Sequence, residues 1–371
     1  MAAEPILIIG ASVRAAAFSA ARAGFAPYWL DQYGDADLRE RFPGLAVAAG
    51  DYPRGLAEAA GRLPSMPFMV TGAMENHLAV LDALAARRPL LGNDSAVCRA
   101  VRDPFALQRC LAAAGLPGPA VTSAPAEDGD WLCKPLLGAG GKGIAVYASG
   151  GPVPPGCYLQ EFIQGRHLSA VFVGDGQRAW LAGVTRQLLG KAAFYAAPFA
   201  YCGSLGPLAL DAAEAEQWRA VGNAVAAAFG LRGLFGVDAV QRGEAIYPVE
   251  VNPRYTASVE VIEAGTGLAL IDQHVRASRG ELSPPVVRHR GVYGKCHLFA
   301  PARFTVQVDL LTLPMPCEMD EVTLADVPAP GTVIAAGHPV ATLLAGGRDQ
   351  RECLRLLTQG AATVLERVNG E

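Results

Sequence analysis

Lysine is scarce in this sequence of 371 residues. Of the 31 basic residues, 27 are arginine, and the four lysines are Lys134, Lys142, Lys191 and Lys295. The formal net charge of −4 excludes the broad positive field with which proteins gather nucleic acid or anionic lipid, so neither partner is expected. A chain that avoids lysine can still keep it where a compact ammonium fits beside a phosphate better than the planar fork of arginine. Composition bias would explain the same count, so the neighbours of each lysine decide between these interpretations.

Patterned cysteines and unbroken apolar runs are missing as well. The eight cysteines are scattered, without a C-x-x-C pair or a Cys/His spacing, so neither a disulfide framework nor a structural zinc site is expected. The uncharged stretches 192–210 and 327–347 are long enough to span a membrane, but prolines and glycines break both, and we expect surface or site loops there. The N-terminus carries Glu4 in place of a basic region, so we expect a cytoplasmic location and no membrane partner.

What the chain does contain is an alternation of apolar runs and helical patterns. Near the N-terminus, strands are expected at 5–9, 27–30, 68–70 and 90–91, and helices at 14–23 and 75–87, which predicts a parallel α/β sheet. The spacing in sequence from Gly10 to Asp31 is typical of a dinucleotide-binding site. Ser12, however, replaces the second glycine of the G-x-G-x-x-G motif, so NAD binding is disfavoured. The turn that remains, at a helix N-terminus, can hold a carboxylate or a phosphate.

The later part of the chain alternates less regularly. A helix is expected over 97–114, closed by a Gly-Leu-Pro-Gly-Pro stop, and others at 214–229 and 350–368. Further strands are expected at 131–134, 143–147, 158–162, 168–173, 179–184, 234–240, 245–251, 293–299 and 340–344.

A glycine-rich loop joins the expected strands at 131–134 and 143–147. Its four glycines within six residues are Gly138, Gly140, Gly141 and Gly143, and their backbone N–H groups can form an anion nest. A Walker loop is excluded, because that motif requires Ser or Thr after its Gly-Lys and this chain has Gly143 there. A dinucleotide fingerprint also fails, since a strand follows the loop instead of a helix. We therefore predict a hairpin whose tip covers phosphates, with Lys134 and Lys142 as cations; a plain surface hairpin is the alternative.

Two carboxylates and an amide are expected to converge on the hairpin formed by 234–240 and 245–251. Glu250 and Asn252 lie two residues apart on one strand, so their side chains share a face, and Asp238 lies on the neighbouring strand. This donor set suits Mg²⁺, which takes carboxylates and completes its octahedron with water and substrate phosphates. Arg254 follows and can brace a phosphoryl group or a substrate carboxylate. Exposed acids on an edge strand are the alternative.

The glycine-rich loop, the segment 158–169 and this acid set, in this order, resemble the ATP-grasp superfamily of carboxylate–amine ligases. The resemblance implies an α/β and α+β architecture, the ATP-grasp fold. It has a Rossmann-like pre-domain at 1–93 and a two-lobed nucleotide-binding domain at 94–290, with a lid at about 120–160. A β-rich segment at 291–371 with a terminal helix completes the large lobe. The implied cofactors are ATP and Mg²⁺, with Mn²⁺ as an alternative metal.

The same resemblance implies roles for individual residues. Those expected to bind the nucleotide are Lys134 and the four loop glycines at the phosphates, Gln160, Glu161, Phe162 and Ile163 at the adenine, and His167, where the family often has a ribose-binding acid. The expected metal ligands are Asp238, Glu250 and Asn252, and the expected catalytic residues are Arg254, Lys142 and Arg186. Pro104 follows Asp103 where the family often has a second phosphate lysine, and Arg102 or Arg109 is the candidate substitute.

The implied chemistry is phosphoryl transfer from ATP to a small-molecule carboxylate, followed by attack of an amine and release of ADP and phosphate. An aromatic loop (Phe194, Tyr195, Phe199, Tyr201) either admits a hydrophobic substrate part or belongs to the core, and the Glu75-Asn76 turn either binds a ligand or caps a helix. This loop, Asn252-Pro253-Arg254 and the segment from Asp326 also look similar to tyramine–glutamate ligases of methanofuran synthesis. A bicarbonate-dependent carboxylase of the same superfamily and a non-catalytic nucleotide-binding regulator are the alternatives, and homo-oligomerisation is left open.

Overall fold

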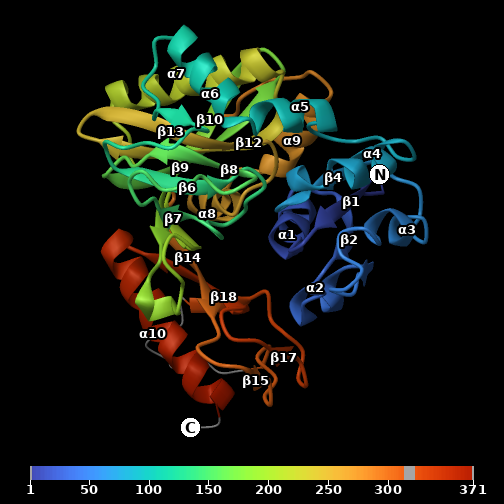
Figure 1. Ribbon diagram of the computed structural model, residues 1–371. Helices are drawn as coiled ribbons and strands as arrows, with labels where there is room; N and C mark the ends of the chain where they lie inside the picture. The colour runs from blue at the N-terminus through green and yellow to red at the C-terminus, as the bar shows by residue number, and fades with distance from the viewer. Residues whose placement is uncertain (1, 313–321, 370–371) are drawn as a thin grey trace.

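The computed structural model describes residues 2–312 and 322–369, and in Figure 1 its N-terminal unit lies to one side of a larger body of strands and helices. The N-terminal unit is a parallel sheet of order β3-β2-β1-β4, formed by Gly44–Ala46, Ala26–Asp31, Pro5–Gly10 and Phe68–Val70. Its helices are α1 (Arg14–Arg22), α2 (Ala36–Arg41), α3 (Leu56–Ala60), the short η1 (Met74–Asn76) and α4 (Leu78–Ala85). The strand expected at 90–91 is only a single bridge from Leu90 to Phe68, because the chain turns at Gly92, where φ is 114°.

A small antiparallel sheet of order β5-β8-β6-β7 follows, formed by Val121–Thr122, Cys157–Glu161, Trp131–Pro135 and Ala145–Val146. Two helices precede it, α5 (Ser95–Val101) and α6 (Pro104–Ala113), where the sequence predicted one continuous helix. That prediction was wrong because the Asp103 side chain accepts a hydrogen bond from the N–H of Phe105 and starts a new helix with Pro104 in its first turn.

The largest sheet has eight strands in the order β13-β12-β9-β10-β11-β14-β18-β16. Its strands are β9 (Arg166–Asp175), β10 (Ala179–Leu189), β11 (Tyr201–Gly206), β12 (Arg232–Arg242), β13 (Ala245–Asn252), β14 (Val292–Phe299), β16 (Val322–Ala325) and β18 (Pro339–Gly347). The remaining elements are η2 (Ala192–Phe194), the strand pair β15 (Phe304–Thr305) and β17 (Val333–Ile334), and the helices α7 (Ala212–Phe229), α8 (Ser258–Thr266), α9 (Leu270–Ser278) and α10 (Gln350–Asn369).

Parts of the two stretches expected to be surface or site loops belong to sheets. Residues 192–210 contain β11, an interior strand between β10 and β14, and residues 327–347 contain β17 and also β18, which includes the strand expected at 340–344. The glycines that argued for loops are tolerated because they allow close packing: a Cβ at Gly203 would collide with the backbone of Lys295 on β14. In the described residues no helix is long and apolar enough to cross a membrane.

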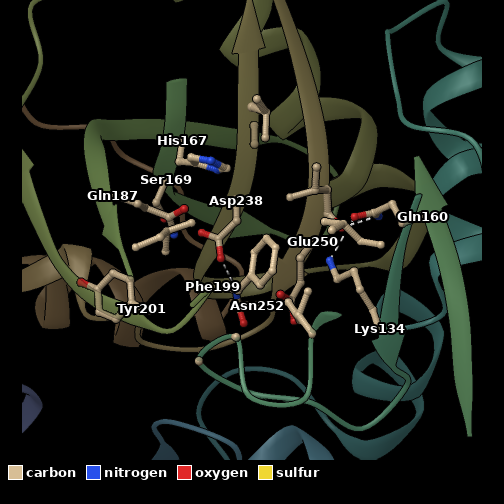
Figure 2. Close-up of a pocket in the computed structure, with 18 of the residues that line it drawn as sticks. Lys134, Gln160, His167, Ser169, Gln187, Phe199, Tyr201, Asp238, Glu250 and Asn252 are labelled. Carbon is tan, nitrogen blue, oxygen red and sulfur yellow. Dashed lines mark hydrogen bonds between the residues drawn. The ribbon is translucent and has the colours of Figure 1, made fainter. Parts of the chain in front are cut away.

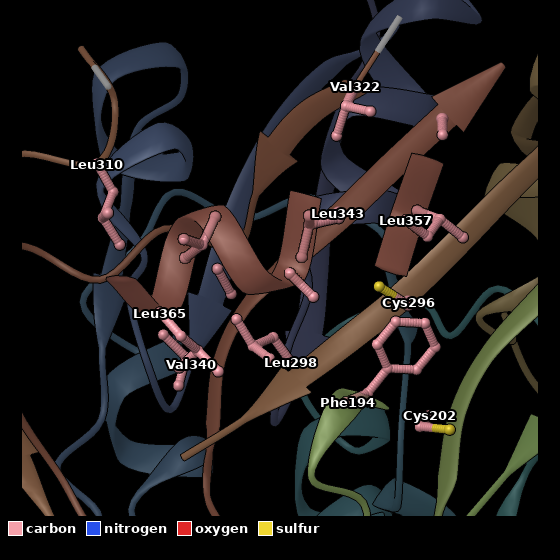
Figure 3. Close-up of a cluster of buried hydrophobic side chains, with 14 of the residues drawn as sticks. Phe194, Cys202, Cys296, Leu298, Leu310, Val322, Val340, Leu343, Leu357 and Leu365 are labelled. Carbon is pink, nitrogen blue, oxygen red and sulfur yellow. The ribbon is translucent and has the colours of Figure 1, made fainter. Parts of the chain in front are cut away.

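Separate apolar clusters hold these layers together. One packs α10 against β14 and β18 and includes Leu298, Leu343 and Leu357 (Figure 3). A second joins α1 of the N-terminal unit to α8 and α9 through Ile262 and Val275. Each such buried side chain contributes about 2 kcal/mol of transfer free energy. The N-terminal unit is thereby packed, through α1, against the helices α8 and α9 that lie next to the large sheet.

Candidate functional site

A cavity lies between the small sheet and the large sheet, with walls from β6, β8, β9, β10, β12 and β13 (Figure 2). It brings together most of the residues singled out in the sequence: Lys134, Gly140, Gly141, Gln160, Glu161, Phe162, Ile163, His167, Asp238, Glu250, Asn252 and Arg254. An adjoining cavity is lined by Arg102, Gly138 and Lys142 and shares Lys134 and Glu250 with the first. Residues more than a hundred positions apart in the chain thus meet in one place.

Gly143 and Arg186 line neither of these two cavities. Arg186 precedes Gln187, which does line the larger cavity, and successive side chains of a strand point to opposite faces. The structure therefore does not bring Arg186 to the site. The four aromatic residues of the loop that the sequence singled out also differ in position. Phe199 and Tyr201 line the cavity, whereas Phe194 is fully buried in the apolar core and Tyr195 is half exposed.

The two acids of the site face each other across β12 and β13. Asp238 pairs in register with Glu250, and Gly236 pairs with Asn252, so all three polar side chains emerge on one side. The Asn252 Nδ2 donates to Asp238 Oδ2 at 3.2 Å. Burial and the neighbouring Glu250 charge raise the pKa of Asp238 to about 6, against hydrogen bonds from Ser169 and Gln187 that lower it. Asp238 therefore takes up its negative charge less readily than an exposed aspartate does.

This donor set fits a divalent cation. It offers carboxylate oxygens and an amide oxygen, the ligands that Mg²⁺ prefers, and a cation would relieve the repulsion that raises the pKa of Asp238. No three His, Cys, Asp or Glu side chains gather as a metal-binding group within 2–312 and 322–369. Asn252 and ligands from outside the chain would therefore have to complete the coordination shell.

Lys134 is buried in the wall of both cavities. Its Nζ donates to Gln160 Oε1 at 3.0 Å, and the Gln160 Nε2 donates to the carbonyl of Val249 on β13 at 3.1 Å. Burial lowers the pKa of Lys134, and the charges of Glu250 and Asp238 oppose that shift. The amide of Gln160, expected at the adenine, thus holds the lysine against the acid strand. Burial also lowers the pKa of His167 in the cavity wall.

Arg102 connects the glycine-rich loop to the acid pair. Its guanidinium donates to Glu250 Oε1 at 2.8 Å, to the carbonyl of Gly138 at 2.8 Å and to Asn76 Oδ1 at 3.1 Å. Of the two candidate substitutes for a second phosphate cation, Arg102 is therefore at the site. Arg109 is mostly exposed and lies 3.9 Å from Asp103, away from both cavities.

The tip of the glycine-rich loop packs on the chain before β11. The N–H of Tyr201 donates to the carbonyl of Gly140 at 3.0 Å. At Gly141, φ is 80° and a Cβ would collide with the carbonyl oxygen of Phe199, so glycine is required there. The hairpin interpretation holds, although its second strand is only the two residues of β7.

Arg254 is fixed by Glu75 of the N-terminal unit. The Arg254 Nε lies 2.9 and 2.8 Å from the two carboxylate oxygens of Glu75, and another guanidinium nitrogen donates to Asn252 Oδ1 at 3.1 Å. Burial alone would raise the pKa of Glu75, but Arg254 and Arg102 hold it below its usual range. Glu75 is thus a counter-ion of the site, a role that the sequence did not indicate. Ser169 and Gln187 were also missed, because short polar residues inside apolar strands carry no spacing signal.

The turn after β1 is already filled by the chain's own carboxylate. Asp31 accepts hydrogen bonds from the N–H groups of Val13, Tyr33 and Gly34 at 2.8, 2.5 and 2.6 Å. The anion that a ligand was expected to supply there is therefore Asp31 itself.

Sequence comparison finds a domain family and several relatives that match part of this chain. Residues 101–258 match the sequence model of a family described as ATP-grasp domain. The carbamoyl phosphate synthase large chain of Streptomyces avermitilis is 25% identical over 218 residues, which cover 52% of this chain and 19% of that protein. The chain thus spans about a fifth of the length of this relative.

Solved structures resemble nearly the whole chain. The biotin carboxylase domain of 2-oxoglutarate carboxylase from Hydrogenobacter thermophilus, in complex with MgADP and bicarbonate, has a TM-score of 0.72 at 14% identity, covering 94% of this chain and 87% of that one. Phosphoribosylamine–glycine ligase from Thermotoga maritima has a TM-score of 0.71 at 16% identity, covering 97% and 96%. The predicted ATP-grasp fold is confirmed, and residues 101–258 carry the sequence match to an ATP-grasp domain.

Proposed function

We propose that the protein is an ATP- and Mg²⁺-dependent ligase that activates a small carboxylate as an acyl phosphate and joins it to an amine. The observation that carries the proposal is the buried Asp238, whose pKa is raised by burial and by the neighbouring Glu250, in one cavity with Lys134 and the glycine-rich loop. The ATP-grasp domain match supports the nucleotide. We also propose that the carboxylate substrate is an amino acid, so that the protein is an amino acid–amine ligase.

Each group has an assigned task. Asp238, Glu250 and Asn252 would hold Mg²⁺, which supplies charge neutralisation at the nucleotide phosphates when bound. Lys134 and Arg102 present buried cations to the same phosphates, and Lys142 adds a third from the loop. Arg254, locked by Glu75, orients Asn252. Gln160, Glu161, Phe162, Ile163 and His167 line the part of the cavity assigned to the nucleoside.

The reaction balances without a protein nucleophile. A carboxylate oxygen attacks the terminal phosphorus of ATP, and the bond to the ADP oxygen breaks, which gives acyl phosphate and ADP. The amine nitrogen then attacks the acyl carbon, inorganic phosphate leaves, and the nitrogen loses one proton. Closure of Gly138–Gly141 over the cavity excludes the water that would otherwise hydrolyse the acyl phosphate.

The test measures ADP release with a panel of amino acids crossed with amines, followed by the mass of the product. We expect release that requires both substrates, and its abolition in Glu250→Gln and Asn252→Ala with unchanged melting temperature. Unchanged turnover in both variants would remove the metal assignment. Release that needs bicarbonate but no amine would identify a carboxylase, and tight ATP binding without any release would identify a regulator.

A further inference from the structure

Lys134 differs from a neighbouring cation of the site in the kind of group that holds it. The Arg102 guanidinium donates to the carboxylate of Glu250 at 2.8 Å. In the residues that the structure describes, Lys134 forms no ion pair, and its Nζ donates to the neutral amide oxygen of Gln160 at 3.0 Å (Figure 2). The fold therefore holds Lys134 in place without pairing its charge with a carboxylate.

The amide of Gln160 can face Lys134 in only one orientation. Its Nε2 donates to the carbonyl of Val249 at 3.1 Å, which leaves Oε1 toward the lysine. A carbonyl oxygen only accepts and an ammonium only donates, so turning the amide over would break both hydrogen bonds. Gln160 is only 3% exposed, so water does not readily replace either partner. The position of Lys134 is thus tied to β13, the strand that carries Glu250 and Asn252.

The register of the small sheet brings these two side chains together. Lys134 on β6 pairs with Tyr158 on β8, and Gln160 follows Tyr158 by two residues, so both side chains point to the same face. Both line the larger cavity, and Lys134 also lines the adjoining cavity together with the glycine-rich loop. Gln160 therefore connects the lysine that lies where the two cavities meet to the large sheet.

A second buried lysine shows what a carboxylate in place of Gln160 would do. Lys295 is 2% exposed and donates to Glu260 at 2.8 Å, so its charge is paired within the fold. An ammonium has three donors, and a neutral acceptor such as Gln160 fixes its position through one of them without cancelling its charge. A buried cation held in this way can still attract an anion that enters the cavity.

We infer that Gln160 is a positioning residue that presents Lys134 to the phosphates of the nucleotide, and that its lack of charge is as necessary as its hydrogen bond. The inference rests on the proposed function. It also gives the Gln160 side chain a task at the phosphates, whereas the resemblance to the superfamily placed this residue at the adenine. A glutamate here would keep the shape of the side chain, but it would pair with Lys134 and repel the phosphates.

The test is calorimetric binding of ATP with Mg²⁺, and of adenosine, to the whole protein without a carboxylate or amine substrate. Gln160→Glu should weaken ATP binding at least about tenfold and leave the binding of adenosine, which has no phosphate, unchanged. A thermal melt checks that the variant is folded. The matched control is Gln164→Glu, the same substitution at an exposed residue of the same segment that lines neither cavity, and it should leave ATP binding unchanged.

A double-variant cycle tests whether Gln160 acts through Lys134. Gln160→Met removes the hydrogen bond without adding a charge, and it should weaken ATP binding about fivefold. In a Lys134→Met background the same substitution should cause almost no further loss, because no ammonium remains to be positioned.

Three results would overturn the inference. These are unchanged ATP binding in Gln160→Glu, equal losses of ATP and adenosine binding, which would place the side chain at the adenine, and additive losses in the double variant. Because no turnover is measured, the ligase proposal is judged separately: the expected losses of ATP binding support the inference even if ADP release is never found. Absence of ATP binding by the wild type would overturn both.

Discussion

Two sets of buried carboxylates lie close to each other on the same scaffold and differ in charge balance. In the cavity, burial and Glu250 raise the pKa of Asp238 to about 6. Where α1 of the N-terminal unit meets α8, burial would also raise the pKa of Glu260, but its ion pairs with Arg14 and Lys295 lower that pKa to about 2. The difference is the number of cations within hydrogen-bonding distance: among residues 2–312 and 322–369, Glu260 has two and Asp238 has none.

This contrast separates carboxylates that the fold itself pairs with cations from a carboxylate that it leaves without one. A carboxylate whose partners are built into the fold costs stability when it is removed, because the partners remain buried and unpaired. A carboxylate that lacks partners is strained by the fold and gains from a ligand that brings positive charge. Arg14 and Glu260 join α1 to α8, whereas Asp238 faces the cavity and accepts only from uncharged donors in the described part of the chain.

The largest effect that this contrast predicts is on folding. Glu260→Gln should lower the free energy of unfolding by about 3 to 5 kcal/mol, because Lys295 loses its ion-pair partner and Arg14 loses one of its partners in a buried site. Chemical denaturation measures it. Glu216→Gln, which breaks only the exposed pair with Arg219, should cost about 0.5 kcal/mol or less. A loss of the same size in both variants would contradict the contrast.

Asp238→Asn should lower activity without lowering stability, the opposite of the loss of stability expected for Glu260→Gln. Turnover should fall at least about a hundredfold, equivalent to about 2.7 kcal/mol, because one charged ligand of the proposed metal site is lost. The melting temperature should stay the same or rise, since the repulsion from Glu250 is removed. Steady-state kinetics and thermal denaturation of one preparation measure both effects. A lower melting temperature with retained turnover would mean that Asp238 stabilises the fold and does not take part in the reaction.

The pH dependence of stability should differ in sign between the two sets. The folded pKa of Glu260, about 2, lies below its ordinary 4.5, so its contribution is complete above pH 4.5 and is lost as the pH falls toward 2. The folded pKa of Asp238, about 6, lies above its ordinary 3.8, so its penalty is absent below pH 3.8 and complete above pH 6.

The measurement is denaturation of wild type, Glu260→Gln and Asp238→Asn across pH 3 to 7. We expect the advantage of wild type over Glu260→Gln to shrink by up to about 2 kcal/mol toward low pH. The advantage of Asp238→Asn over wild type should grow by a similar amount as the pH rises through the window from 3.8 to 6. Parallel curves for all three proteins would show that neither carboxyl group is shifted.

The sequence predicted the parts of this arrangement that depend on local pattern. Asp238, Glu250 and Asn252 were found because alternation along two neighbouring strands determines which side chains share a face, and the glycine-rich loop was found from its composition. Arg186 lines neither cavity, and the apolar pattern of β10 could not tell which face of that strand meets the cavity. The partnerships of Arg14 with Glu260 and of Glu75 with Arg254 join residues 246 and 179 positions apart, and no local signal encodes such contacts.

The smallest predicted effect concerns two of the scarce lysines, one near each of the two carboxylate sets. Lys295 is buried against Glu260, and Lys134 is buried between Gln160 and the acid strand. Lys134→Arg should raise the KM for ATP about tenfold, or about 1.4 kcal/mol, with a smaller change in kcat, because a planar guanidinium does not fit the space of a compact ammonium. Lys191→Arg, at a residue that lines neither cavity, should leave both constants unchanged. Full activity with an unchanged KM in Lys134→Arg would mean that composition alone, rather than phosphate binding, accounts for lysine at this position.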